Sequence, residues 1–373
     1  MIQIKRIFHP VGQGAFYVER HPNFNVVYDC GTLHPSKSFY ETIRQAFSDD
    51  EEIDILFISH LDWDHISGLE TLKKRVKKIK RVILPLLDNA DKLLLLSSWK
   101  KSQINQCGNL IVDPSNFFGS ETEIIFVEPD ENEQRETQLG EPQNLESLHG
   151  KIKSRTPISY LNSDWFFIPF NYDKKIRSNQ FDLNLQQQKL FISCLNGQLL
   201  LDILVDARKK KILKKCYDQL KGQGFGDINE NSMVLYSGPK EKGNYFLSIV
   251  NIYPCHLFNG CAFWDVDLFE RDVGCVYMGD SDSNKFNLSC VYGLVWDLVG
   301  TIQIPHHGSI NNYHSQNIFA GRDHFICPIS FGNSNSFGHP SSKVLSDICA
   351  LKSKPICITE SKDSLLVEII EKR

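Results

Sequence analysis

Long apolar stretches are missing from this 373-residue chain. It has no run of about 18 apolar residues, so the sequence predicts no membrane span. The first six residues, Met1 to Arg6, contain no apolar h-region, and we therefore expect no secretory signal. We also find no internal repeat.

Paired cysteines are missing as well, because none of the 11 cysteines belongs to a CxxC motif. Most of them lie in apolar runs, such as Cys275 and Cys327. The odd number and these surroundings predict reduced, buried thiols in a cytoplasmic protein. Cys255 and Cys261 flank His256, but their spacing fits no known zinc motif.

The chain also lacks an excess of positive charge. The net charge is −4 and the pI is about 6.3, which does not favour a strong, general nucleic-acid binder. A nuclease with few, focused substrate contacts stays compatible with these values. Hydrophobic residues make up 41% and charged residues 23%, as in an ordinary soluble protein of one large or two modest domains.

Short strands and helices alternate in the first part of the chain. Residues 2–8 alternate apolar and polar side chains, residues 25–29 form a short apolar run, and both predict strands. A helix is expected at 37–47. The continuous apolar run 53–58 predicts a buried strand, followed by a helix near His65 and another strand. In such α/β folds, ligands gather at the carboxyl ends of the strands.

The middle of the chain differs from its two ends. Residues 129–155 are polar and without periodicity, which predicts an exposed loop. A strand is expected at 164–170, and residues 176–225 are expected to be mostly helical. We interpret residues 130–226 as an insertion in one domain that spans 1–373. Beyond it, further strands are expected at 233–236, 245–250 and 274–278, and strands and helices alternate again in 291–373.

The strongest functional signal is a hexapeptide that reads His-Leu-Asp-Trp-Asp-His. Its four potential metal ligands, His60, Asp62, Asp64 and His65, directly follow the predicted buried strand. Imidazole and carboxylate together suit Zn, Mn or Fe. The alternative is a polar turn with a helix cap. Such a turn rarely holds two His and two Asp at these intervals, so we favour a metal site.

Three further groups of polar residues each follow a predicted strand. Asp280 comes directly after a glycine, His306 and His307 are adjacent, and His339 precedes a proline. Each group alone is a weak signal. Four such groups at strand ends of one α/β chain are hard to assign to chance.

The combined pattern resembles the metallo-β-lactamase superfamily, whose signature is HxHxDH followed by a His, an Asp and a final His. The match is closer to the metallo-hydrolase domain of the ComEC competence proteins, and it keeps the same order over about residues 1–345, apart from the insertion. The matching segments are Val11–Ala15, Tyr28–Gly31, His60–His65, Asn229–Leu235, Gly279–Asp280, His306–Ser309 and Gly338–Pro340.

Some positions depart from the pattern. Ala15 stands where the subgroup usually has Asp, and Asp62 stands where the wider superfamily has His. The second change is shared with the ComEC-type proteins. Because no membrane segments accompany the domain, a role as a DNA-uptake channel is not supported.

The resemblance implies an α/β fold, an αββα sandwich with an insertion, that binds two divalent metal ions. Zn or Mn is expected, and the oxygen ligand that Asp62 adds makes Mg possible. The implied ligands are His60 and Asp62 for the first ion, Asp64, His65 and either His306 or His307 for the second, and Asp280 for both.

The resemblance also implies roles for residues that are not metal ligands. Asp29 would support the metal-ligand loop, and Asp64 and His339 are the expected catalytic residues. His339 would bind the phosphate or protonate the leaving group. The central His of the signature has no obvious match: neither His149 nor His256 lies at the expected strand end. Asn229 or Asn231 is the expected substitute.

The resemblance implies a metal-dependent hydrolase, and in particular a phosphodiesterase or nuclease that would attack with a hydroxide shared by two metal ions. Its substrate would be a nucleic acid or a nucleotide. The alternatives are a carboxyl-ester, lactone or thioester hydrolase, which needs an apolar pocket, and a non-catalytic module that binds a partner. A further hypothesis is an effector of bacterial antiviral defence that a regulatory protein partner keeps inactive.

Two basic stretches have two interpretations each. Residues 73–81 and 208–215 are rich in Lys and Arg, which either attract phosphates or form a solvated helix face. We favour the solvated face. Trp63, inside the metal motif, either stacks on a base or packs beneath the loop.

Overall fold

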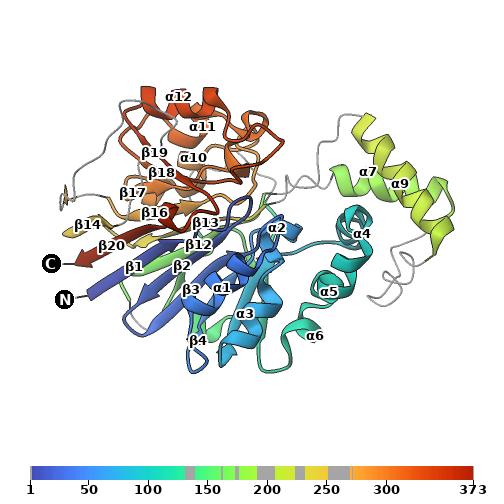
Figure 1. Ribbon diagram of the computed structural model, residues 1–373, viewed down its shortest axis with the longest axis horizontal. Helices are drawn as coiled ribbons and strands as arrows, with labels where there is room; N and C mark the ends of the chain where they lie inside the picture. The colour runs from blue at the N-terminus through green and yellow to red at the C-terminus, as the bar shows by residue number, and fades with distance from the viewer. Residues whose placement is uncertain are drawn as a thin grey trace.

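Two large β-sheets pack face to face, and helices cover their outer faces (Figure 1). The computed structural model describes residues 2–130, 139–160, 163–172, 176–190, 206–222, 232–250, 269–270 and 272–372. Three apolar cores correspond to the layers: one between the sheets and one between each sheet and its helices. The expected αββα sandwich is confirmed.

The first sheet contains ten strands within the described residues, in the order β10-β8-β7-β5-β3-β2-β1-β20-β14-β15. Strands β3, β5, β7 and β8 run parallel, so their carboxyl ends share one edge. The first and last strands of the chain, β1 and β20, are antiparallel neighbours. The strands are β1 (Ile2–Phe8), β2 (Phe16–His21), β3 (Phe24–Cys30), β5 (Ile55–Phe57), β7 (Arg81–Pro85), β8 (Glu123–Glu128), β10 (Gly150–Lys153), β14 (Tyr245–Val250), β15 (Phe269–Glu270) and β20 (Leu366–Lys372).

The second sheet has eight strands in the same described part of the chain, in the order β19-β18-β17-β16-β13-β12-β11-β9. Its strands β16 to β19 are parallel. The bounds are β9 (Gln143–Asn144), β11 (Ile158–Ser159), β12 (Trp165–Phe170), β13 (Val234–Pro239), β16 (Gly274–Tyr277), β17 (Val299–Ile302), β18 (Ile326–Ser330) and β19 (Lys354–Ile358), while β4 (Glu52–Ile53) and β6 (Lys78–Ile79) form a separate small pair.

Helices form the two outer layers. Over the first sheet lie α1 (Lys37–Ala46), α2 (Trp63–Ile66), α3 (Leu69–Arg75), α4 (Asn89–Ser98), α5 (Lys101–Val112) and α6 (Pro114–Phe118), and over the second lie α10 (Leu288–Trp296), α11 (Ser315–Phe319) and α12 (Ser342–Ala350). Two further helices, α7 (Ile176–Gln187) and α9 (Ala207–Gly222), pack on α4 at the side of the sandwich (Figure 1). Short 3₁₀ turns lie at Leu145–Ser147, His306–Gly308, Ile310–Asn312 and Lys362–Ser364.

Strand β5 explains why residues 55–57 are apolar without alternation. Ile55 and Phe57 belong to the core between the sheets, while Leu56 belongs to the core beneath the helices. Both faces of this strand are therefore buried, and every position is apolar. The predicted strand is confirmed, as are the strands expected near 2–8 and 25–29 and the helix near 37–47.

A charged group lies between the two sheets. The alternation of β1 places Arg6 on the same inward face as Ile4 and Phe8, and its side chain is fully buried. The guanidinium pairs with Glu19 at 2.9 Å and with Glu368 at 2.6 Å. A buried charge of this kind is tolerated only when it is paired and hydrogen-bonded.

The loop predicted for the middle of the chain differs from the structure. Residues 139–155 of the expected loop include β9, β10 and a 3₁₀ turn, so the prediction is wrong for that part. The strand expected at 164–170 is confirmed as β12, which pairs with β13 inside the second sheet. The helices α7 and α9 confirm the helical character of their segment. The boundaries of the insertion at 130–226 stay a prediction.

Two other expectations concern cysteines and membranes. Cys30, Cys107, Cys216 and Cys275 are buried thiols, as expected, whereas Cys290 is exposed. Every helix in the described parts of the chain is too short or too polar to cross a bilayer.

Candidate metal centre

Residues from three separate loops meet at one edge of the sandwich. These loops follow the carboxyl ends of β5, β16 and β17, where polar side chains were expected to gather. Asp64, His65, Asp280 and His307 each offer a ligand atom, and these atoms all lie within 4.8 Å of one another. His60 borders this group, with its Nε2 atom 3.9 Å from Oδ2 of Asp280.

Two imidazoles of this group are oriented in the same way. His65 donates from Nδ1 to Oδ2 of Asp29 at 2.7 Å, and His307 donates from Nδ1 to the carbonyl oxygen of Ser330 at 2.8 Å. Their Nε2 atoms face Oδ1 of Asp280 at 3.2 Å and 3.8 Å. A hydrogen bond at one ring nitrogen fixes the tautomer in which the other nitrogen can bind a metal.

His60 is also held at Nδ1 while its Nε2 faces Asp280, on the side of the other carboxylate oxygen. Its Nδ1 lies 2.9 Å from Oγ of Ser59 and 3.2 Å from Oγ of Ser232. Because the Ser59 hydroxyl donates to Asp29 at 2.6 Å, its oxygen is left to accept from His60. The Nε2 atoms of His60 and His65 are buried and have no hydrogen-bond partner among the described residues. Such atoms are placed to receive a ligand.

Asp29 stands directly behind His65. Its carboxylate is fully buried and also accepts the backbone N–H of Ser59 at 2.7 Å. Its φ of 56° lies in the left-handed region, which Asp and Asn adopt more readily than most other residues. Asp29 thus contacts the metal-motif loop through Ser59 and His65.

The turn before Asp280 depends on a glycine. Gly279 has a φ of 53°, and a Cβ atom there would lie 2.3 Å from Oγ of Ser232. The backbone N–H of Asp280 donates to that same oxygen at 3.0 Å, and Gln303 accepts the N–H groups of Met278 and Gly279 at 2.8 Å each. These bonds orient the Asp280 carboxylate between His60 and His65.

The electrostatics of the cluster match its geometry. Burial by itself raises the pKa of Asp280, but the neighbouring imidazoles, His307 foremost, outweigh it and hold that pKa well below its usual value. Burial by itself lowers the pKa of His65, but the carboxylates of Asp280 and Asp29 raise it well above its usual value. Negative charge held among buried imidazoles is the environment that a bound cation satisfies.

The rings of His306 and His307 lie in different surroundings. The φ angles of His306 and His307 are positive, at 48° and 56°, and that of Gly308 is also positive, at 79°. His307 joins the cluster, with Nε2 3.2 Å from Oδ2 of Asp64. The ring of His306 instead lies 5.9 Å from that of His339, and its buried Nδ1 has no partner within the described residues. Consecutive left-handed residues are strained and occur at functional sites.

His339 lies at the mouth of the cluster. Its ring is half-buried and stacks on the exposed ring of Phe337, with centroids 5.8 Å apart. Burial, and then the charges of His307 and His306, lower the pKa of His339 to about 4. The ring is therefore neutral at pH 7 in the protein without substrate.

Some expected site residues lie elsewhere. Asp62 occupies the N-cap position of α2 without a capping hydrogen bond from its side chain, and it stands outside the group of four ligands. His149 is 72% exposed and pairs with Glu123, so it takes no part in the cluster. Asn229, Asn231, Cys255, His256 and Cys261 lie outside the described residues.

Sequence reasoning missed the residues that hold the ligands in place. Ser59, Ser232, Gln303 and Ser330 all bond to ligand side chains or to the turn before Asp280. Ser59 was adjacent to the motif, and Ser232 lay in a segment that the family pattern marked. Nothing local distinguished Gln303 or Ser330 from other strand residues.

The ambiguous residues near the motif are resolved by their packing. Trp63 packs on the core beneath the helices and meets Trp99 edge-on, with centroids 6.3 Å apart. In the stretch 73–81, Lys73 and Lys74 pair with Glu70 at 3.3 Å and 3.0 Å. The solvated-face interpretation of that stretch is therefore supported.

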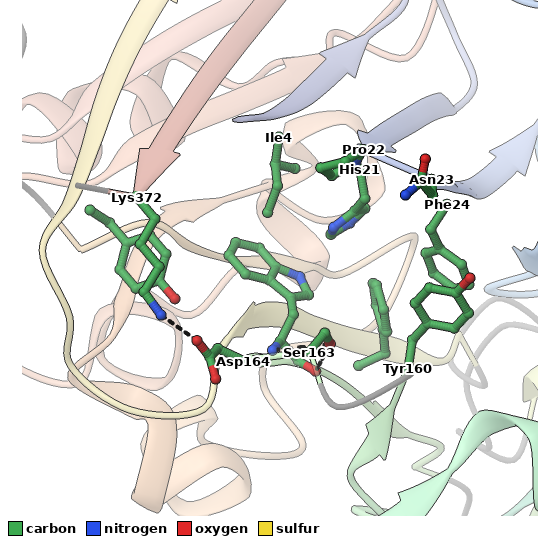
Figure 2. Close-up of a pocket in the computed structure, with 12 residues that line it drawn as sticks. Ile4, His21, Pro22, Asn23, Phe24, Tyr160, Ser163, Asp164 and Lys372 are labelled. Carbon is green, nitrogen blue, oxygen red and sulfur yellow. Dashed lines mark hydrogen bonds and ion pairs between the residues drawn. The ribbon is translucent and has the colours of Figure 1, made fainter. Parts of the chain in front are cut away.

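Two cavities differ in place and chemistry. One of about 430 Å³ lies beside the metal cluster, between the loops 10–13, 32–38 and 332–337, and its lining mixes polar side chains with the apolar surface of Val11, Leu33, Phe39 and Phe337. The other, of about 460 Å³, is lined by aromatic rings including Phe24, Tyr160 and Trp165 (Figure 2). Because it opens at the turn between β2 and β3, it lies at the end of the sandwich opposite to the metal cluster.

The donor set fits divalent metal ions. Imidazole nitrogens and carboxylate oxygens suit Zn, Mn and Fe, and the buried Nε2 atoms of His60 and His65 face a shared carboxylate. Four candidate ligands come from three separate segments of the chain, so the site exists only in the folded protein.

The family whose model matches this chain is described as the metallo-beta-lactamase superfamily. The match covers residues 9–152, less than half of the chain, and includes Asp29 and the segment 60–65. Asp280, His307 and His339 lie beyond it. Together with the two packed sheets, the match identifies the metallo-β-lactamase fold.

Two solved structures resemble parts of the chain. A structure described as a peroxy diiron species of the chemotaxis sensor ODP shares 21% identity over 34% of this chain and 42% of that chain, with a TM-score of 0.21. The metallo-beta-lactamase fold protein YhfI from Bacillus subtilis shares 10% identity over 45% of this chain and 52% of that chain, with a TM-score of 0.24. The chain thus spans about half the length of these proteins. A comparison with curated proteins finds no match.

Proposed function

We propose that this protein is a metal-dependent hydrolase that cleaves phosphodiesters in a nucleic acid or a nucleotide. One observation carries the proposal. The imidazoles of His60, His65 and His307 are each held at Nδ1 by the protein, and their Nε2 atoms converge on the two oxygens of Asp280. These imidazoles and Asp280 would together hold two divalent metal ions.

Two sets of ligands would hold these ions. His60, whose Nε2 lies 3.9 Å from Oδ2 of Asp280, would hold the first ion, and Asp62 joins this set on the resemblance of the motif alone. A second set of three residues would hold the other ion on the side of Oδ1, and consists of Asp64, His65 and His307. When bound, two such ions act as Lewis acids that activate water and neutralise charge on the phosphate.

The residues around this cluster suit a phosphate. His306 and His339 face each other beside the ligands, and each can donate an N–H to a phosphate oxygen. An anion bound there raises the pKa of His339, which brings that ring closer to the protonated form that a leaving alkoxide needs. We therefore assign phosphate binding to His306, and both phosphate binding and proton donation to His339.

The position of the aromatic cavity favours this substrate over an acyl substrate. An ester, lactone or thioester hydrolase needs an apolar pocket at its metal centre. The aromatic cavity of Figure 2 lies at the opposite end of the sandwich, while the cavity beside the metal cluster has a mixed polar and apolar lining. The likeness of the motifs to the ComEC-type subgroup points in the same direction. The antiviral-defence hypothesis stays a prediction that the neighbouring genes test.

The direct test is a metal-dependent cleavage assay on the purified chain. The substrates are bis(p-nitrophenyl) phosphate, single- and double-stranded DNA and RNA, and p-nitrophenyl acetate, each with Mn²⁺, Mg²⁺ or Zn²⁺. We expect phosphodiester cleavage that Asp64→Asn lowers at least ~100-fold, as loss of a catalytic metal contact does. Asp49→Asn, an exposed aspartate away from the cluster, makes the same chemical change and should keep full activity.

Other results of this assay would indicate other functions. Cleavage of the acetate alone would establish an acyl hydrolase. Metal binding without cleavage of any substrate, or no metal binding at all, would contradict the proposal and favour a module that binds a partner.

A further inference from the structure

Helix α9 concentrates positive charge in an otherwise acidic protein. Seven of its 16 residues are Lys or Arg and only one is acidic, while the whole chain has a net charge of −4. The positive charge is therefore local to this helix. Such a helix attracts polyanions from solution without making the whole surface a general nucleic-acid binder.

The basic side chains of α9 are available to a ligand. Arg208, Lys210, Lys211, Lys214 and Lys215 are exposed, and no ion pair joins them to another residue in the part of the chain that the structure describes. By contrast, several other surface lysines are paired with a carboxylate. These are Lys74 with Glu70, Lys77 with Glu52, Lys78 with Glu121 and Lys343 with Asp347.

The opposite face of α9 is fixed to the body of the protein. Leu213, Cys216 and Leu220 are buried in the core that α4 and α7 share with the first sheet. The charged face therefore has a defined position instead of belonging to a free tail. A fixed array of cations loses less entropy on binding than a disordered basic segment.

This position connects α9 to the metal cluster. Helix α4, on which α9 packs, follows β7, whose carboxyl end lies at the same sheet edge as the ligand loops. Trp99, at the end of α4, meets Trp63 of the metal motif. In Figure 1, α2, α4 and α9 follow one another across the same side of the molecule.

We propose that the basic face of α9 binds the phosphate backbone of a nucleic-acid strand whose scissile phosphate lies at the metal cluster. This inference rests on the proposed function and narrows its substrate to a polynucleotide, in preference to a mononucleotide. Lys and Arg neutralise successive phosphates without reading the sequence, and each contact adds to the salt dependence of binding.

The test separates strand binding from catalysis. A fourfold variant of α9 (Lys210→Gln, Lys211→Gln, Lys214→Gln, Lys215→Gln) is compared with a control of equal charge change (Lys74→Gln, Lys77→Gln, Lys78→Gln, Lys343→Gln). Both are made in the full chain, with Asp64→Asn added for binding studies. Binding of fluorescent 30-residue DNA and RNA strands is measured by anisotropy at several salt concentrations. Hydrolysis of bis(p-nitrophenyl) phosphate is measured without Asp64→Asn.

We expect the α9 variant to bind strands about tenfold or more weakly at 100 mM salt, and its salt slope to fall by roughly 0.7–0.9 per lost contact. The control should keep affinity and slope, and both should hydrolyse the small diester like the unmodified protein. Equal affinity loss in the two variants, or an unchanged slope in the α9 variant, would overturn the inference. So would binding of the intact α9 face to phosphatidylserine vesicles but not to strands. Because binding is measured without cleavage, a failed diester assay counts against the proposed function and not against strand binding.

Discussion

Asp29 accepts a hydrogen bond from His65: Nδ1 of the imidazole lies 2.7 Å from Oδ2 of the buried carboxylate. The other ring nitrogen lies 3.2 Å from Asp280. The carboxylate therefore sets both the tautomer and the orientation of the ring, and leaves Nε2 for a metal ion. It reaches the ring from β3, a strand that supplies no ligand of its own.

This relationship predicts the effect of Asp29→Asn. Asparagine tolerates the φ of 56° at this position, so the backbone should keep its path. The negative charge that makes His65 more basic is lost, and we expect metal affinity to fall roughly 10–100-fold. A competition titration with a metal chelator measures it. Asp54→Asn removes another buried carboxylate, which pairs with Lys80, and should leave metal affinity unchanged.

The buried pair of Arg6 and Glu368 predicts a large loss of stability. Arg6→Met leaves Glu19 and Glu368 buried without their cation, which should lower the free energy of unfolding by about 3–5 kcal/mol. Urea unfolding measures the loss. Lys343→Gln breaks an exposed pair with Asp347 and should cost no more than about 0.5 kcal/mol. Equal losses in the two variants would show that Arg6 is not the cation on which these carboxylates depend.

The buried ring of His9 predicts how stability depends on pH. It stacks on Phe16 with centroids 4.5 Å apart, and burial, followed by the charge of Arg20, lowers its pKa to about 3. Below pH ~6.5 the unfolded chain binds a proton at His9 that the folded protein does not bind. As pH falls from about 6.5 to about 3, this group should therefore lower the free energy of unfolding by up to about 1.4 kcal/mol per pH unit.

His9→Phe isolates this contribution, because it keeps a ring against Phe16 and removes the titration. We expect unfolding free energies, measured by urea titration at successive pH values, to fall less steeply in the variant between pH 6.5 and pH 3. Parallel curves for the two proteins would mean that His9 takes up its proton in the folded state.

Local patterns predicted the parts of the site that are close in sequence. The apolar run before Ser59 and the ligand spacing from His60 to His65 are readable because one strand and one turn position them all. Ser232 and Gln303 were not readable, because their partners are 172 and 24 or 25 residues away. Long-range packing decides which serine or glutamine meets a ligand.

Backbone conformation limited other predictions. Which of His306 and His307 reaches the cluster depends on consecutive residues with positive φ, and adjacent identical side chains carry no signal for it. Strand β9, with Gln143 and Asn144 both exposed, has neither length nor apolar alternation, so its segment resembled a loop.

The number of metal ions bound per chain tests the central claim most directly. Native mass spectrometry of the protein loaded with Mn²⁺ or Zn²⁺ counts them in the unmodified chain and in Asp280→Ala. Since Asp280 lies between His60 on one side and His65 and His307 on the other, we predict two ions in the unmodified chain and at most one in the variant. Two ions retained without the Asp280 carboxylate, or none in the unmodified chain, would contradict the account.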